Sequence, residues 1–181
     1  MTKRALIVVD LQNDYLTSGK FPLVGIDAAL ENAARVVDAA RRSGEMVINV
    51  RHESPVDGPF FAVGTEGAEI TSKMAPQDGE AIVTKRHPNS FRETELADLL
   101  STAGVDEVTV IGAMSHMCID ATARAASDLG YKTTIVEDAC ATRDLEFKGE
   151  VVSADKVHAA YMSALAFGYG QVVSTADYLA K

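Results

Sequence analysis

Three side chains with complementary reactivity each follow an apolar segment of strand type. Asp10 comes directly after the first segment, Lys85 after the third, and Cys118 lies shortly beyond the fourth. The carboxyl ends of strands in an open parallel sheet share one edge, so these side chains are expected to meet there. A thiolate attacks as a nucleophile, a carboxylate relays its proton, and an ammonium stabilises anionic charge. Together they predict a nucleophilic catalytic site.

Each of these residues also has an ordinary structural explanation. An aspartate after a buried strand often ends a turn, a lysine at a strand end is usually solvated, and a cysteine is usually a small buried hydrophobe. Cys118 is further expected at the amino terminus of a helix, where free amides and the helix dipole would lower the pKa of its thiol. The combination favours catalysis without naming a reaction.

The elements that position these residues alternate between strand and helix. Apolar strand-like segments separated by segments of helical period are typical of repeated βα units and a mostly parallel sheet. The predicted strands span 5–9, 46–50, 81–84, 108–111, 133–136 and 171–173. Helices are expected after an N-cap at Asp27, after a capping box over 90–93, from near Cys118 to Gly130, and from Ser153.

One connection is much longer than the others. The 29 residues of 51–79 show no sustained period, whereas ordinary βα connections take about 2–6 residues. They leave the carboxyl end of a predicted strand, which is where open α/β sheets bind ligands. We therefore expect 51–79 to be a functional loop.

Length and charge limit the class of protein. A chain of 181 residues predicts one domain over 1–181, and its net charge of −9 makes nucleic acid and membranes unexpected partners. Only the five apolar residues 5–9 lie near the amino terminus, too few for a signal peptide or a membrane span, so a cytoplasmic location is expected. Cys118 and Cys140 form no disulfide framework and are expected to be reduced.

Three sequence motifs resemble those of the isochorismatase-like cysteine hydrolases. They are VVDLQNDY at 8–15, KRHPNSF at 85–91 and VIGAMSHMCIDATAR at 110–124, in that order. Two later motifs, DLGY at 128–131 and VEDAC at 136–140, extend the resemblance to this family over essentially the whole chain. Three ordered motifs are a specific signal of the family.

The resemblance implies a fold, a site and a reaction. The fold is α/β, a three-layer αβα Rossmann-like fold with a six-stranded parallel sheet, and the triad is Asp10, Lys85 and Cys118. The family also places a cis peptide bond between Ala113 and Met114, with the backbone amides of Met114 and Cys118 forming an oxyanion hole. Members that hydrolyse the vinyl ether of isochorismate lack the cysteine. Cys118 therefore favours hydrolysis of a small-molecule C–N (amide) bond through a thioester.

The sequence departs from the metal-using members of the family, the nicotinamidases. These carry an aspartate two residues before a histidine at the end of the second strand, and a further histidine beyond it. Here Val50 precedes His52 at that position, and 53–79 contains no histidine. No metal is therefore expected. Glycine-rich phosphate-binding motifs are missing as well, so no cofactor of any kind is expected.

A small-molecule substrate is the expected partner, in a homo-oligomer (dimer or tetramer) that the resemblance implies. Pocket candidates near the predicted edge are Tyr15, His52, Ser54, Phe60, Phe91 and His116. Two other functions stay open. One is a vinyl-ether hydrolase of the isochorismatase type, and the other is a non-catalytic protein that binds a ligand or senses oxidants through its thiol.

Overall fold

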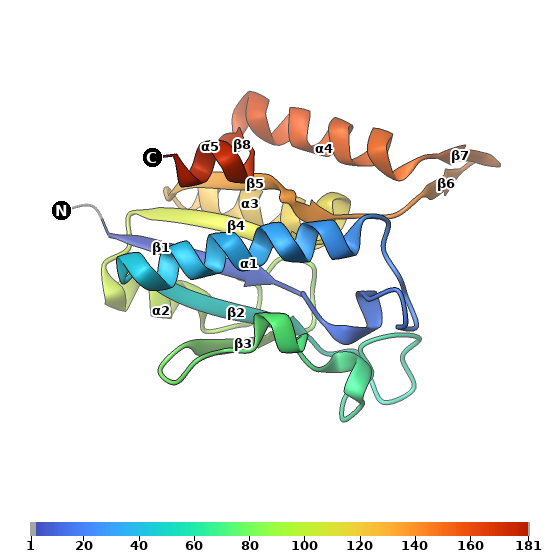
Figure 1. Ribbon diagram of the computed structural model, residues 1–181, viewed down its shortest axis with the longest axis horizontal. Coiled ribbons are helices and arrows are strands. Elements are labelled where there is room, and N and C mark those ends of the chain that lie inside the picture. Colours follow the sequence, from blue (N-terminus) through green and yellow to red (C-terminus); the bar gives the residue numbers. More distant parts are fainter. Residues whose placement is uncertain (1–2, 181) are drawn as a thin grey trace.

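Six parallel strands form the centre of the molecule, and residues 3–180 are described in a computed structural model (Figure 1). The sheet has the order β3-β2-β1-β4-β5-β8, and all of its pairings are parallel. The strands are β1 (Arg4–Val9), β2 (Met46–His52), β3 (Ala81–Lys85), β4 (Glu107–Ala113), β5 (Lys132–Ala141) and β8 (Gln171–Val173). All six predicted strands are present.

Helices cover both faces of this sheet. One face packs against α1 (Ile26–Ser43) and α5 (Thr175–Leu179). The other packs against α2 (Leu96–Ala103), α3 (Asp120–Asp128) and α4 (Ala154–Gly168). The predicted three-layer αβα fold with a six-stranded parallel sheet is therefore confirmed. No helix among residues 3–180 is both long and apolar enough to cross a bilayer.

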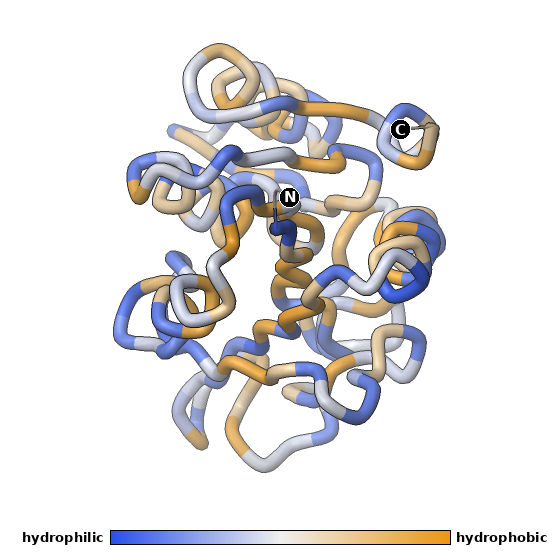
Figure 2. Tube along the Cα trace, turned by 90° about the vertical axis from the view of Figure 1, so that its left-hand side faces the viewer, coloured by the Kyte–Doolittle hydropathy of each residue, from blue (hydrophilic) through white to orange (hydrophobic). Residues whose placement is uncertain are grey.

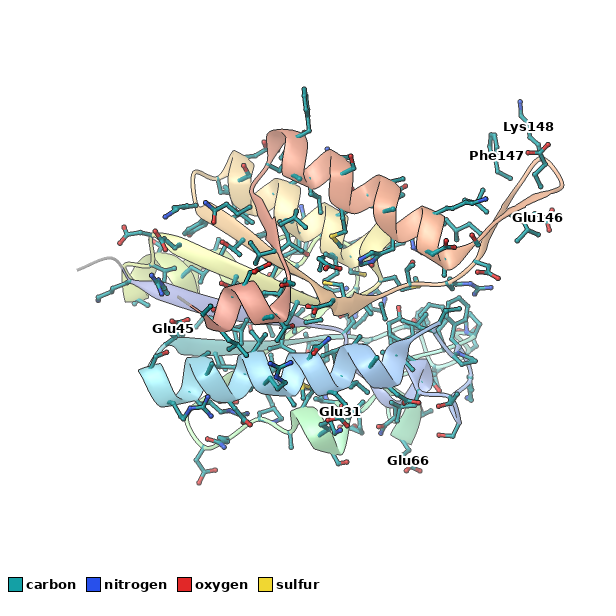
Figure 3. The ribbon with its side chains drawn as sticks, turned by 45° about the horizontal axis from the view of Figure 1, so that its top comes forward. Glu31, Glu45, Glu66, Glu146, Phe147 and Lys148 are labelled. Atoms are coloured by element: carbon teal, nitrogen blue, oxygen red, sulfur yellow. The ribbon has the colours of Figure 1, made fainter. Side chains whose placement is uncertain are left out.

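Short elements fill the connections at the carboxyl edge of the sheet. They are the 3-10 turns η1 (Asn13–Tyr15), η2 (Glu66–Ala68) and η3 (Ser72–Met74), and the π-helical turn η4 (Ser115–Ile119). An antiparallel hairpin of β6 (Leu145–Phe147) and β7 (Glu150–Val152) joins β5 to α4. Glu146, Phe147 and Lys148 lie at its end and project beyond the body of the molecule (Figure 3).

The central strands are apolar on both faces because helices bury both. Figure 2 shows hydrophobic segments through the middle of the molecule and hydrophilic ones around it. In β1, every residue from Ala5 to Val9 is at most 3% exposed. Such strands appear in a sequence as continuous apolar runs rather than alternating ones. This is why the predicted strands agree so closely with the structure.

Gly112 brings β4 directly against β1 at the carboxyl edge of the sheet. Its φ of +127° is one that side chains rarely adopt, and a Cβ there would lie 1.9 Å from the carbonyl oxygen of Val9. The pairing of β4 with β5 shifts register between Val110 and Gly112. Only glycine permits this close approach. It holds the residue after Val9, which is Asp10, beside the end of β4.

Two of the predicted helix starts are wrong. Ser90 does not cap α2, which begins at Leu96, because its hydroxyl lies 2.8 Å from the Thr122 hydroxyl of α3. Asp27 does not cap α1 either, because the N-cap is Gly25 in a left-handed conformation and Asp27 is the second residue of the helix. The helix predicted to start near Cys118 is present, since Cys118 lies inside η4 and α3 follows from Asp120. At Ser90 a tertiary contact replaces the local cap, and at α1 a left-handed glycine begins the helix without a side-chain cap.

Candidate active site

The structure brings Asp10, Lys85 and Cys118 into direct contact. The ammonium Nζ of Lys85 donates to Asp10 Oδ2 at 2.7 Å and to Cys118 Sγ at 3.2 Å. The three residues are at most 6% exposed. They come from the carboxyl ends of β1 and β3 and from the turn after β4, as the strand positions predict. Lys85 is therefore a buried cation between a carboxylate and a thiol.

Asp10 holds one carboxylate oxygen free for chemistry. Its φ of +52° is uncommon for a residue other than glycine, and its amide donates to the Val50 carbonyl at 2.9 Å. Lys85 binds Oδ2, whereas the buried Oδ1 has no hydrogen-bond partner among residues 3–180. A buried acceptor without a donor is costly, so its occurrence calls for a functional explanation. Oδ1 is the oxygen available to accept a proton.

Burial and neighbouring charges together determine the charge states of the thiol and the ammonium. Burial, followed by the charge of Asp10, raises the pKa of Cys118, and Lys85 offsets this only in part. The expected lowering of the thiol pKa by a helix terminus is therefore wrong, because desolvation outweighs it. Burial opposes the charge on Lys85, but the charge of Asp10, and that of Cys118 when it is a thiolate, raise the pKa of Lys85 overall. The resting pair is a protonated thiol and a charged ammonium.

The turn that carries Cys118 also presents backbone amides. The peptide bond between Ala113 and Met114 is cis. The Met114 carbonyl accepts from the amides of Met117 and Ile119, which closes the π-helical turn around Cys118. No hydrogen bond joins the Met114 amide to any other residue of 3–180. That amide is free to bind a ligand oxygen.

Aromatic rings lie on the α1 side of the triad. Tyr15 contacts Phe61 with ring centroids 4.5 Å apart, and Phe60 stacks on Phe21 at 4.3 Å. Burial, and then the charges of Asp10 and Cys118, raise the pKa of Tyr15. We call Tyr15, Phe21, Phe60 and Phe61 the aromatic wall. It contains two of the predicted pocket residues.

His52 is the predicted pocket residue that lies nearest to the triad. Its Nδ1 is 3.2 Å from Lys85 Nζ, and its ring centroid is 6.2 Å from that of Phe61. Burial and the charge of Lys85 lower the pKa of His52. The side chain is therefore neutral near pH 7, with Nδ1 accepting from the ammonium.

The other predicted pocket residues, apart from the aromatic wall, make their contacts with residues outside the triad. Ser54 hydrogen-bonds through its backbone to the Phe61 carbonyl at 2.9 Å, and it borders a surface depression of about 420 Å³. His116 Nδ1 lies 2.6 Å from the Thr142 hydroxyl, on the side of α4. Phe91 stacks on Tyr131 at the start of β5, which is the opposite edge of the sheet. Phe91 therefore packs with the α2 and α3 layer, and its part in a pocket stays a prediction.

Sequence reasoning missed two residues that shape the long loop. The Gln12 side-chain amide donates to the carbonyls of His52 and Ala68 at 2.8 and 2.7 Å and accepts from the His52 amide. Asp14 Oδ2 accepts from the Phe61 amide at 2.7 Å. Both are buried polar residues within the first motif, and that is the signal that could have identified them. They fix the loop after β2 against η1.

The sequence analysis also did not identify Arg143, whose side chain lies beside the aromatic wall. Its guanidinium lies over the ring of Phe21, 4.3 Å from the centroid, and is half-buried. After burial itself, the charge of Arg143 is the cause that lowers the pKa of His116. A cation therefore lies over one ring of the aromatic wall, and its charge also acts on His116.

The side chains around the triad do not form a metal site. Among residues 3–180 no cluster of three or more histidine, cysteine or carboxylate side chains could hold an ion. The Nδ1 atom of His52 faces an ammonium, which competes with a cation for the same lone pair. Zinc and iron sites need three or more such ligands.

We predict that activity does not require a metal ion. Dialysis against EDTA followed by assay in metal-free buffer is expected to leave kcat within about twofold of its starting value, because the ligand set is incomplete. A matched sample supplied with zinc, iron or manganese serves as the control. Loss of activity with EDTA that one of these metals restores would contradict the prediction.

A family model described as the isochorismatase domain matches residues 4–177. The chain belongs to the isochorismatase family. It is 43% identical over 176 residues to an uncharacterized isochorismatase family protein, YddQ of Bacillus subtilis, covering 97% of this chain and 98% of that one. A solved isochorismatase hydrolase from Oleispira antarctica has 47% identity and a TM-score of 0.97, covering 99% and 97% of the two chains.

Relatives with a named reaction include amidases. Maleamate amidohydrolase of Pseudomonas putida is 32% identical over 191 residues, covering 97% of this chain and 84% of that protein. Isochorismatase-family relatives of this chain are hydrolases, and the similar solved structures include a cysteine hydrolase. These relatives show the family and the general class of reaction.

Proposed function

We propose that this isochorismatase-family protein hydrolyses the amide bond of a small molecule through a thioester on Cys118. The observation that carries the proposal is the buried contact of one ammonium with both Asp10 and Cys118, with Asp10 Oδ1 left free. One cation is thus within hydrogen-bond reach of both the nucleophile and the base, which supports covalent catalysis. The amidohydrolase among the relatives supports the same reaction class.

The proposed steps assign one role to each of these groups. Cys118 Sγ attacks the amide carbon while its proton passes to Asp10 Oδ1. The resulting oxyanion accepts hydrogen bonds from the Met114 and Cys118 amides. Asp10 then gives the proton to the leaving nitrogen, the C–N bond breaks, and ammonia or an amine departs. Water attacks the thioester and loses its proton to Asp10, which returns it to the thiolate as the acid leaves.

The raised thiol pKa fits this order of events. A protonated thiol is stable in the resting site, and it loses its proton as Sγ bonds to the substrate carbon. Lys85 stays charged throughout because Asp10 and the thiolate favour the ammonium. The lysine therefore stabilises negative charge on its neighbours without taking part in proton transfer.

Trapping the acyl group tests the proposal. We expect hydroxylamine added during turnover of a primary amide to divert the acyl group from acid to hydroxamate, because it competes with water for the thioester. Rapid quench and mass spectrometry are expected to show the acyl mass on Cys118 and none on Cys140. An active enzyme that forms neither product has no acyl intermediate, and the proposal would then be wrong.

Arg143 predicts a preference among amides. Maleamate is a carboxylate, and a guanidinium beside the aromatic wall offers a charge-assisted hydrogen bond to such a group. We expect Arg143→Met to raise KM about 10–100-fold for an amide that carries a carboxylate, the size of one such bond. A neutral amide of equal length is expected to be unaffected.

Arg124→Met is the matched control for this prediction. Arg124 also lies over an aromatic ring, that of Tyr169, at 4.4 Å, and it belongs to α3 away from the triad. It is expected to leave both KM values unchanged. Equal effects of Arg143→Met on charged and neutral amides would show that Arg143 acts by packing alone.

A further inference from the structure

A line of side chains connects the catalytic turn to the protein surface. Ser115 is the first residue of η4 and fully buried, and its Oγ lies 2.8 Å from Nδ1 of His158 on α4. The other ring nitrogen of His158, Nε2, lies 3.4 Å from Oε2 of Glu137 on β5. None of these three residues belongs to the triad. The line therefore joins α4 and β5 to the turn that holds the nucleophile.

The donors and acceptors along this line are determined by their chemistry. A carboxylate only accepts, so the hydrogen on the Glu137 side belongs to His158 Nε2. With the imidazole neutral, Nδ1 then accepts and Ser115 donates its single hydrogen to it. With the imidazole charged, Nδ1 donates to Ser115, which turns its hydrogen to the Ala141 carbonyl at 3.3 Å. Ser115 is bound to α4 in both states.

Ser115 follows directly on the free amide of the site. Met114 is the N-cap residue of η4, and its amide has no partner among residues 3–180. Among residues 3–180, Ser115 Oγ has two partners, which are the Ala141 carbonyl of β5 and the side chain of His158. If the backbone at Ser115 rotated, the amide of the neighbouring Met114 would turn away from a substrate oxyanion.

The position of α4 explains why such a contact is needed. The hairpin β6–β7 separates α4 from β5 and projects from the molecule (Figures 1 and 3). At its first turn, α4 is held by the Ala154 amide, which donates to Asp144 at 2.7 Å. His158 lies one turn further along and contacts η4 from there.

We propose that His158, held by Glu137, is a positioning residue that fixes Ser115 and so aims the Met114 amide at the oxyanion of the acyl-transfer reaction. The proposal rests on the proposed function for its substrate chemistry. His158 touches neither the triad nor the substrate, and it acts through Ser115. Removing this support is expected to weaken oxyanion binding while leaving the Asp10–Lys85–Cys118 contacts intact.

Two reactions of Cys118 separate this role from general destabilisation. A small aliphatic aldehyde adds to the thiol as a hemithioacetal whose oxygen needs the Met114 amide. Iodoacetamide alkylates the thiol by displacement at a methylene carbon and forms no such oxygen. We expect Ser115→Ala and His158→Leu each to weaken aldehyde binding about tenfold, measured as protection from alkylation, and to leave the alkylation rate itself within about twofold.

Turnover of an amide gives the second readout. A small misplacement of a catalytic group can cost about 100-fold in rate, so kcat is expected to fall about 10–100-fold in either variant with KM nearly unchanged. The double variant is expected to be no slower than the single ones, because both break the same connection. His158→Asn, whose amide oxygen replaces Nδ1 as an acceptor for Ser115, is expected to recover most of the rate.

His87→Gln is the matched control. His87 also pairs with a carboxylate, Glu93, at 3.2 Å, but on the surface. The His87→Gln variant is expected to keep wild-type aldehyde binding, alkylation rate, kcat and KM. The proposal is wrong if the Ser115 and His158 variants bind aldehyde like the wild type, or if aldehyde binding and alkylation fall together. The proposed amidase function fails separately, if amide turnover survives Cys118→Ala.

Discussion

Cys118→Ala is expected to abolish amide hydrolysis while the protein keeps its fold. Loss of the nucleophile in a serine hydrolase costs about 10⁶-fold in kcat, and we expect a loss of that order. The substitution removes one sulfur atom from a buried position, so unfolding free energy should change by only about 1–2 kcal/mol. Steady-state kinetics and thermal unfolding of the same preparation check both statements.

Cys140→Ala is the matched control for the nucleophile. Cys140 is also buried, with Sγ 3.4 Å from the Val136 carbonyl and a thiol pKa that burial raises to about 12. It is expected to retain wild-type kcat. Turnover of amides by Cys118→Ala would disprove the cysteine mechanism, and turnover of isochorismate by that variant would favour vinyl-ether hydrolysis. A wild-type protein that alkylates stoichiometrically yet turns over no amide would favour a thiol sensor.

Lys85→Met is expected to lower kcat/KM at least about 10³-fold and to destabilise the fold. Its ammonium is the partner of Asp10 Oδ2 at 2.7 Å, and both side chains are fully buried. Breaking a buried pair leaves an uncompensated charge and costs about 3–5 kcal/mol. Kinetics at a temperature well below the unfolding midpoint separate the loss of activity from the loss of stability.

The double variant Asp10→Asn with Lys85→Met provides the control. Replacing both charges removes the uncompensated carboxylate, so the double variant is expected to recover most of the lost stability. It should remain inactive, because an amide cannot accept the thiol proton. Near-normal rates in Lys85→Met would mean that the lysine serves only to stabilise the fold.

The strands and the triad could be predicted because their signals are local. A parallel strand buried on both faces is a continuous apolar run, and the residue that follows it lies at the carboxyl edge. Asp10 and Lys85 were found in this way. The order of the motifs then supplied the family, which the match over residues 4–177 confirms.

The loop contacts could not be predicted because their partners are backbone atoms far along the chain. Gln12 binds the carbonyls of His52 and Ala68, which are 40 and 56 residues away. Every residue has a backbone carbonyl, so the sequence does not indicate which carbonyls Gln12 binds. The failed capping box at Ser90 has a related cause. Its hydroxyl binds Thr122, 32 residues away, so a tertiary contact replaced the local one.

The protonation state of the Cys118 thiol depends on two opposing effects, and their relative size cannot be predicted from the sequence. A turn at the start of a helix favours thiolate, whereas burial favours thiol, and only the packed structure shows that Cys118 is 6% exposed. The same holds for Arg143, whose position over Phe21 depends on a loop packing against η1. Arginine in a connecting segment is ordinarily solvent-exposed.

The contacts of Lys85 also determine when activity can first arise during folding. Lys85 meets Asp10 across 75 residues of chain and Cys118 across 33. Contacts of such long range form late, because the intervening loops must close first. A chain still being synthesised can contain β1 and β3 and yet have no nucleophile beside its lysine. Recovery of aldehyde-protected thiol is therefore expected to follow, and not precede, the helical signal on refolding.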